Sequence, residues 1–202
     1  MLLIKRKAKP FKGKWALPGG LVLDKESLDQ AVERELREET GIDVNYLEQL
    51  YSFGSPNRDP RNRVISVAYF ALVRKSNFEL HASTDAEEAK WINIKELPKL
   101  SFDHNKIIDV AVNRLRGKIG YQPIGFELLD EKFPFSDLHK LYELIYNESI
   151  DRRNFKKKFL QLNILEELDE KVSKGKGRPG SLFRFNRTKY FKLKESGVVF
   201  EV

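Results

Sequence analysis

The stretch "GGLVLDKESLDQAVERELREETGI", residues 19–42, decides the organisation of the chain around it. Apolar residues recur at helical spacing from residue 28, and Gly41 stands where glycine usually follows a helix C-terminus. The spacing predicts a helix over residues 28–40. Upstream, "KWALPGGLVL" predicts a strand, a Pro-Gly-Gly break and a second strand. This short region also concentrates acidic residues, namely Asp24, Glu26, Asp29, Glu33, Glu35, Glu38 and Glu39.

Three of these acids lie on the helix face expected to point toward the protein body. At ~100° per residue, Glu35, Glu38 and Glu39 continue the stripe of Leu28, Ala31 and Val32, whereas Glu26, Glu33 and Arg37 lie opposite. Like charges at this spacing cost ~0.2–0.5 kcal/mol per pair, and the C-terminal end of a helix disfavours negative charge. A bound cation removes both penalties. Oxygen ligands without Cys or His suit Mg²⁺ or Mn²⁺, and Mg²⁺ usually shares its ligands with substrate phosphates.

The stretch resembles the signature of the Nudix hydrolases at nine positions: Gly20, Glu26, Arg34, Glu35, Leu36, Glu38, Glu39, Gly41 and Ile42. The resemblance implies that Glu35, Glu38 and Glu39 bind the catalytic metals, with Gly19 offering its carbonyl. It also implies that Glu26 pairs with Arg34 to orient the helix. The family hydrolyses nucleoside diphosphates linked to another moiety. One carboxylate takes the proton of the attacking water, and the sequence leaves open which one.

The charge of the chain is distributed unevenly. The net charge is +7 over 202 residues, yet residues 151–202 hold 14 Lys and Arg against 7 Asp and Glu, and the first 150 residues hold 23 of each. This asymmetry indicates a neutral domain followed by one that meets a polyanion; the alternative is a solubilising basic tail. Cysteine is absent, which fits a reducing cytoplasm. The apolar start is too short for a signal peptide and no stretch is long enough to span a membrane, so we expect no membrane partner.

Strands and helices alternate in the first part, which predicts an α/β or α+β sandwich over residues 1–120. "GYQPIGFELLD" breaks this pattern and predicts a linker at 121–130, followed by a second domain over 131–202. There, "DRRNFKKKF" forms a helix anchored by Phe155 and Phe159, and "KGKGRPG" forms a hairpin tip between two strands. The candidate DNA contacts are Arg152, Arg153, Lys156 and Lys157 in a major groove, and Arg178 in a minor groove or on phosphate. The alternative is an accessory domain with solvated lysines.

Nearly the whole chain resembles the Nudix-related transcriptional regulators, ADP-ribose pyrophosphatase-like proteins in which a Nudix domain precedes a winged helix. The matching stretches are "FGSPNRDPRNRVISVAYFALV", "LPKLSFDHNKII", "QPIGFELL" and "RRNFKKKFLQLNIL". The best known members sense ADP-ribose, and others respond to different small molecules such as a pentose. Many have lost signature glutamates that this chain keeps. Relatives usually begin with an extra strand before the "LLIKR" strand; because this sequence starts at Met1, we expect either a displaced start or a missing N-terminal strand.

Three interpretations therefore stand: a Mg²⁺-dependent hydrolase of ADP-ribose or a similar compound, a repressor whose Nudix domain only senses such a ligand, and both in one chain. Paired winged helices read palindromic sites, so we expect a homodimer on double-stranded DNA. Arg58, Arg61 and Arg63 in "SPNRDPRNR" are candidates to bind a diphosphate or terminal ribose, the alternative being ordinary surface arginines.

Overall fold

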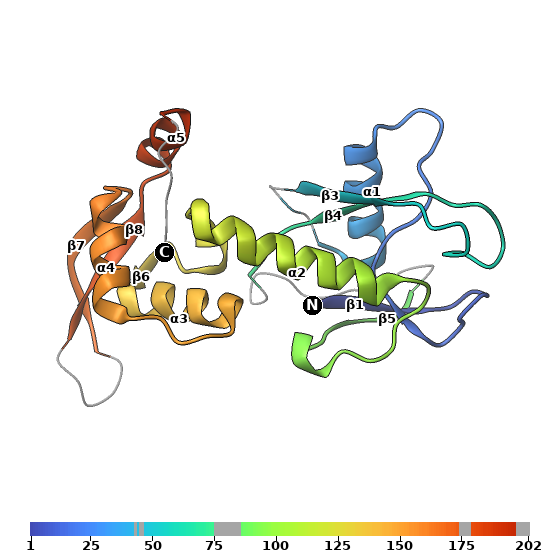
Figure 1. Ribbon diagram of the computed structural model, residues 1–202, viewed down its shortest axis with the longest axis horizontal. Coiled ribbons are helices and arrows are strands. Elements are labelled where there is room, and N and C mark those ends of the chain that lie inside the picture. Colours follow the sequence, from blue (N-terminus) through green and yellow to red (C-terminus); the bar gives the residue numbers. More distant parts are fainter. Residues whose placement is uncertain (43, 45–46, 75–85, 174–178, 197–202) are drawn as a thin grey trace. The chain divides into compact units, whose positions relative to one another are not determined.

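The computed structural model describes residues 1–42, 44, 47–74, 86–173 and 179–196 (Figure 1). The chain divides into two compact units, residues 1–112 and 113–202, and the boundary falls inside helix α2, His104–Tyr121. Both units combine helices with antiparallel strands, as expected for an α/β sandwich followed by a second, smaller domain.

The first unit is built on antiparallel strand pairs. Strand β1, Leu2–Arg6, lies between β2, Trp15–Ala16, and β5, Ala86–Trp91. A second pair joins β3, Glu48–Phe53, to β4, Ser66–Phe70. A short 3-10 turn, η2, Ile94–Glu96, precedes α2. Buried residues of β1 and the start of α2, such as Leu3 and Ile108, form one of its small apolar cores.

Helix α1, Leu28–Thr40, has the bounds that the sequence predicts, because both of its ends are specified locally. At the N-terminus, Ser27 and Gln30 exchange side-chain and backbone hydrogen bonds in a capping box. At the C-terminus, Gly41 adopts φ 73° and donates its N–H to the Arg37 carbonyl at 2.9 Å. The signature carboxylates therefore stand on a well-delimited scaffold.

The expected second strand after the Pro-Gly-Gly break is wrong. Residues 21–23 form a loop, and Leu21 is 77% exposed. Its polar backbone groups bond to side chains: Arg34 donates to the Leu21 carbonyl, and the Leu23 N–H donates to Glu26. Leu28 also departs from expectation, since it is 40% exposed and does not join the buried stripe.

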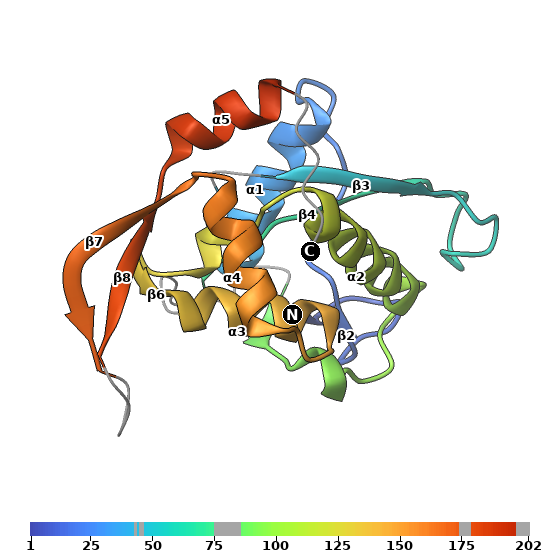
Figure 2. The ribbon, with the colours of Figure 1, turned by 60° about the vertical axis from the view of Figure 1, so that its left-hand side comes forward.

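The second unit has the helices and three-stranded sheet of a winged helix. Helices α3, Phe135–Tyr146, and α4, Arg152–Gln161, pack with a sheet ordered β6-β8-β7. Its strands are β6, Lys132–Pro134, β7, Leu165–Val172, and β8, Gly180–Phe185. A 3-10 turn, η3, Phe126–Leu128, lies before the sheet, and α5, Arg187–Glu195, follows it. Figure 2 shows the β7–β8 hairpin extending away from α3 and α4.

An aromatic core holds this unit together. Phe135, Phe155, Phe159 and Phe183 are all buried, and the ring of Tyr142 lies 5.0 Å from that of Phe155. Burying one such ring contributes roughly 1.5–3 kcal/mol. The exposed face of α4 is therefore presented by a firmly anchored helix.

Candidate functional site

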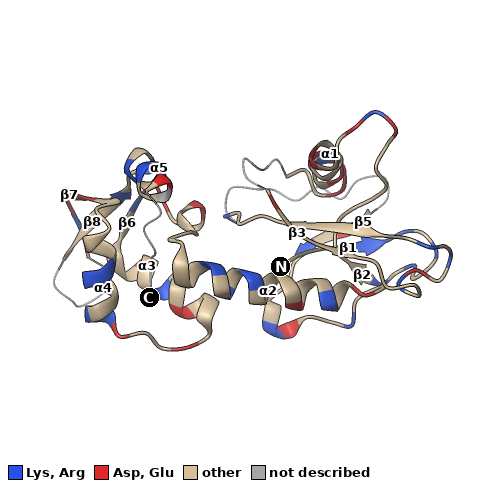
Figure 3. Ribbon diagram, turned by 45° about the horizontal axis from the view of Figure 1, so that its top comes forward, with Lys and Arg blue, Asp and Glu red and all other residues tan. Residues whose placement is uncertain are grey.

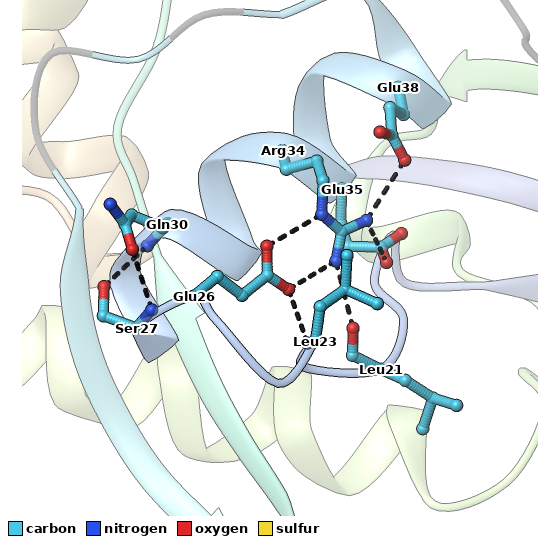
Figure 4. A network of polar contacts seen from close by, with 8 residues as sticks. All are labelled: Leu21, Leu23, Glu26, Ser27, Gln30, Arg34, Glu35 and Glu38. Atoms are coloured by element: carbon cyan, nitrogen blue, oxygen red, sulfur yellow. Dashed lines mark hydrogen bonds and ion pairs between the residues drawn. The ribbon is translucent and has the colours of Figure 1, made fainter.

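The guanidinium of Arg34 is the centre of the candidate diphosphate site (Figure 4). Its Nε and Nη2 donate to the two carboxylate oxygens of Glu26 at 2.9 and 2.7 Å. Its Nη1 donates to Glu35 Oε1 at 2.8 Å and to Glu38 Oε2 at 3.1 Å. Its Nη2 also donates to the Leu21 carbonyl at 3.0 Å. One protein cation thus holds three acidic side chains together with the loop before the helix.

Glu26 is fixed in its ionised form by these bonds. The bidentate hydrogen bonds from Arg34, with a further one from the Leu23 N–H at 2.8 Å, lower the pKa of Glu26 to about 2. The same contacts, first with Glu26 and then with Glu35, raise the pKa of Arg34. Their effect is to tie the loop over residues 21–23 to the middle of α1.

Gly20 provides the space that Glu35 occupies. A Cβ placed on Gly20 would lie 2.0 Å from Glu35 Oε1 and 2.4 Å from its Cδ, much closer than atoms can approach. Only a residue without a side chain leaves room for the carboxylate there. Gly20, the second glycine of the Pro-Gly-Gly turn, is therefore needed so that the Glu35 carboxylate can approach the backbone closely, and not for a positive φ.

Glu39 connects the same turn to the end of the helix. It is only 6% exposed, and its Oε2 accepts the N–H of Gly19 at 2.7 Å. Gly19 has φ 145°, in the region that favours glycine. The turn is thus hydrogen-bonded to Glu39 at Gly19 and packed closely against Glu35 at Gly20.

The three signature glutamates are not equally buried. The Glu35 side chain is 17% exposed and Glu39 points inward, as the helical pattern predicts. Glu38 departs from that prediction, since its side chain is 55% exposed. It lies at the edge of the face and turns back along the helix surface to Arg34, four residues earlier.

The donor set fits Mg²⁺ or Mn²⁺, because it consists of carboxylate oxygens, one of them seated in the cradle at Gly20. Within the described ranges, however, no three acidic or histidine side chains lie close enough together to hold a metal ion as they stand. Glu35 and Glu38 face Arg34, whereas Glu39 faces Gly19. Metal binding therefore requires these carboxylates to reorient, and the exposed Glu38 has the most freedom to do so.

The three candidate arginines of the β3–β4 loop lie in different environments. Arg58 is buried and donates through Nε and Nη2 to both oxygens of Asp103, at 3.1 and 2.7 Å. Arg61 binds Asp59 at 2.8 Å, and Arg63 donates to the Gly54 carbonyl at 2.7 Å. Each guanidinium thus has a protein partner, and the ion pair of Arg58 fixes the loop against the start of α2. Arg61 and, more weakly, Arg58 both lower the pKa of Asp59, so these two arginines share one acidic neighbour.

His104, at the first turn of α2, anchors the segment that leads to the Pro-Gly-Gly turn. Its Nδ1 accepts the N–H of Leu17 at 2.9 Å. Burial lowers the pKa of His104 to about 4, so the ring is neutral and keeps this lone pair available. The roles of Asp103 and His104 depend on partners 45 and 87 residues away, and only the resemblance of "SFDHNK" to the family pointed to this stretch.

Helix α4 is the candidate nucleic-acid interface. Asp151 caps its N-terminus by accepting the Asn154 N–H at 2.8 Å, and Phe155 and Phe159 fix its inner face. The predicted contacts Arg152, Arg153, Lys156 and Lys157 are all exposed. This leaves a cationic outer face, as a helix that enters a major groove requires.

Lys156 differs from the other three cations of this face. Its ammonium lies 5.8 Å from the ring of Phe135 and 5.8 Å from that of Phe183 on β8. It therefore stands beside the aromatic core, toward the β7–β8 hairpin. Arg178, predicted at the hairpin tip, lies outside the described residues.

Comparison with protein families divides the chain close to the boundary between the two compact units, at residues 112 and 113. Residues 1–111 match the NUDIX domain, and residues 125–185 match the "NrtR DNA-binding winged helix domain". None of the described helices has the length and apolar character needed to cross a membrane.

Individual relatives match one or both domains. The "ADPR responsive transcriptional repressor NtrR" of Acinetobacter baylyi is 35% identical over 92% of this chain and 75% of its own length. The ADP-ribose pyrophosphatase of Methanocaldococcus jannaschii is 49% identical over 54% of this chain and 63% of its own length. The crystal structure of Shewanella oneidensis NrtR with a 27mer DNA gives a TM-score of 0.80 at 29% identity, covering 98% of this chain and 89% of that one.

Proposed function

We propose, since the chain belongs to the Nudix family and joins its Nudix domain to an NrtR-type winged helix domain, that it is a ligand-responsive transcriptional regulator that also hydrolyses its ligand. The ligand is ADP-ribose or a similar nucleoside-diphosphate compound. The observation that carries the proposal is the complete set of signature carboxylates, three of them bound to Arg34 and Glu39 bound to Gly19, in the same chain as the cationic face of α4.

The ligand class follows from the relatives and from the site. One relative is an ADP-ribose responsive repressor, another is an ADP-ribose pyrophosphatase, and a NrtR Nudix domain crystallised with ADP ribose gives a TM-score of 0.52. In this chain, Glu35, Glu38, Glu39 and the carbonyl of Gly19 would hold Mg²⁺ or Mn²⁺. Such an ion supplies charge neutralisation for the diphosphate and lowers the pKa of a water nucleophile.

The protein's own residues have separate tasks in this reaction. Arg34, oriented by Glu26, keeps the helix and the loop over residues 21–23 in register. Glu39 and Glu35 hold the Pro-Gly-Gly turn against the helix. We assign the proton transfer to one of the glutamates of this face, Glu38 being the most exposed of the three.

The DNA half of the proposal assigns α4 to base and phosphate contacts through Arg152, Arg153, Lys156 and Lys157, with Lys156 lying beside Phe183 of β8. Arg178 is assigned to the hairpin tip as a phosphate or minor-groove contact. A homodimer would place two such helices on a palindromic site. Ligand binding releases DNA only if the ligand binds more tightly to the conformation that does not bind DNA than to the one that does.

The test combines turnover and DNA binding in the full chain. The protein is incubated with ADP-ribose and Mg²⁺, with and without EDTA, while AMP release is measured, and binding to its own promoter region is followed in parallel. We expect AMP release that EDTA abolishes, and DNA release by ADP-ribose. Glu38→Gln and Glu39→Gln should abolish turnover, whereas Glu33→Gln, on the exposed opposite face, is the matched control.

The outcomes separate the alternatives. Full turnover in both the Glu38→Gln and Glu39→Gln variants would remove the catalytic assignment. If no AMP appears but ADP-ribose still releases DNA, the Nudix domain acts only as a sensor.

A further inference from the structure

The connection between β1 and β2 is strongly basic. Residues 5–14, "KRKAKPFKGK", contain six Lys and Arg and no acidic residue. The balanced charge of the first 150 residues conceals this local excess, which Figure 3 shows as blue along the connection. We call residues 5–14 the lysine hairpin.

Backbone hydrogen bonds give the lysine hairpin a defined shape. Arg6 N–H donates to the Lys14 carbonyl at 3.0 Å, and Gly13 N–H donates to the Arg6 carbonyl at 2.8 Å. Lys14 N–H donates to the Phe11 carbonyl at 3.0 Å, and Arg6 Nε donates to the Pro10 carbonyl at 3.1 Å. Its cations are therefore presented on a folded turn.

An aromatic pair joins the hairpin to the start of α2. The ring of Phe11 meets that of Phe102 edge to face at 4.9 Å. The guanidinium of Arg6 lies 4.9 Å from the Phe102 ring centroid and that of Arg61 lies 5.9 Å from it. Phe11 and Phe102 both have positive φ, 65° and 54°, and Phe11 is still 41% exposed. An exposed aromatic held in an unfavourable backbone conformation indicates a functional surface.

Part of the positive charge of the lysine hairpin is paired: Lys5 lies 3.5 Å from Glu87, and Arg6 and Lys7 also have partners. Two acids near Phe102 are bound by other arginines, in Arg61–Asp59 at 2.8 Å and Arg58–Asp103 at 2.7 Å. Lys9, Lys12 and Lys14 are exposed, and their side chains have no ion pair or hydrogen bond within the described part of the chain. A polyanion would relieve their mutual repulsion.

We propose that the lysine hairpin is a second nucleic-acid-binding surface, on the Nudix unit. Lys9, Lys12 and Lys14 contact phosphates of the backbone, and Phe11 offers a face for a sugar or an unstacked base. An exposed turn with several separate cations suits a polymer of phosphates better than one small nucleotide. This inference goes beyond the proposed function, which assigns DNA contacts to α4 and the β7–β8 hairpin.

The test measures the affinity of the full chain for a mixed-sequence duplex of about 30 base pairs at several salt concentrations. The variant Lys9→Gln/Lys12→Gln/Lys14→Gln is compared with Lys25→Gln/Lys90→Gln/Lys95→Gln, which removes the same charge from exposed lysines elsewhere in the unit. We expect the hairpin variant to bind about tenfold more weakly and its salt slope to fall by about 2–3. Equal affinities and slopes in the two variants would overturn the proposal.

Two further arms distinguish this surface from others. In Arg152→Gln/Arg153→Gln/Lys157→Gln, unchanged duplex binding would contradict the assignment of α4, whereas a loss specific to the hairpin variant would still support the lysine hairpin. Calorimetric titration with ADP tests the alternative that the lysine hairpin binds a free nucleotide and not a nucleic acid. If the hairpin variant loses ADP binding but keeps duplex binding, the surface serves a nucleotide and the proposal is wrong. Unchanged thermal unfolding confirms that the variants are folded.

Discussion

Replacing Gly20 by alanine tests how closely the Pro-Gly-Gly turn positions Glu35. The added Cβ would lie 2.0 Å from Glu35 Oε1, whereas ordinary contact begins at 3.4 Å, so the carboxylate must retreat by about 1.4 Å. The backbone of Gly20 lies outside the positive-φ region, so alanine itself is not strained. A misplacement of about 1 Å lowers catalysis about 100-fold, and we expect Gly20→Ala to lose at least that much diphosphatase turnover.

The free energy of unfolding should hardly change, because two opposite effects act on it. Gly→Ala adds about 0.4–1 kcal/mol by restricting the unfolded chain, and the displaced Glu35 side chain loses contacts in the folded state. The assay measures AMP release at saturating Mg²⁺ and, in parallel, Mn²⁺ affinity and urea unfolding. Gly117→Ala is the matched control, since a Cβ there meets nothing within 4 Å. Full turnover and unchanged Mn²⁺ affinity in Gly20→Ala would refute the role of the cradle.

Three more predictions follow from the environments of Glu26, His104 and Phe155. Hydrogen bonds from Arg34 lower the pKa of Glu26 from 4.5 to about 2 in the folded state. The contribution of Glu26 to stability is therefore complete above about pH 4.5 and is lost toward pH 2. In urea unfolding, Glu26→Gln should show a smaller pH dependence of stability across that window than the unmodified protein. The pKa of His104 is lowered by burial from 6.5 to about 4 in the folded state. The free energy of unfolding therefore falls by up to about 3 kcal/mol as the pH falls from 6.5 to 4. His104→Asn keeps an acceptor for Leu17 and should remove this acid sensitivity in the same measurement. Phe155→Ala should destabilise the second unit by about 3–5 kcal/mol in calorimetric unfolding, whereas Phe191→Ala, exposed by 57%, should change it by less than about 0.5 kcal/mol.

Features with short-range causes could be predicted from the sequence. The bounds of α1 follow from Gly41 at its end, and the cap at Ser27 is completed by Gln30, three residues later. The inner face of α4 follows from the spacing of Phe155 and Phe159. In each case the deciding contact lies within about one helical turn, so residue types at fixed offsets are sufficient.

Features with distant partners could not be predicted. Residues 21–23 have the apolar composition of a strand, but Arg34 and Glu26 bind their backbone groups. Arg58 is one of three similar arginines in its loop, and its burial depends on partners outside the loop, Ser66 and, 45 residues later, Asp103. Helix α5 was also missed, although Asn186 caps it by accepting the Lys189 N–H at 2.8 Å. The periodic pattern there is weak, and the cap was the available signal.

The acidic end of α1 shows how three candidate metal ligands on one helix face are compatible with folding. Glu35, Glu38 and Glu39 would repel one another at the unfavourable end of a helix dipole. Arg34 offsets part of this repulsion through Glu35 and Glu38, and the Gly19 N–H offsets another part through Glu39. These contacts occupy carboxylate oxygens that a divalent ion would need. The ion would therefore compete with Arg34 and the Gly19 N–H for those oxygens. If the site binds a divalent ion and a diphosphate as proposed, phosphate oxygens would favour the ion in that competition, and we expect each ligand to raise the affinity for the other.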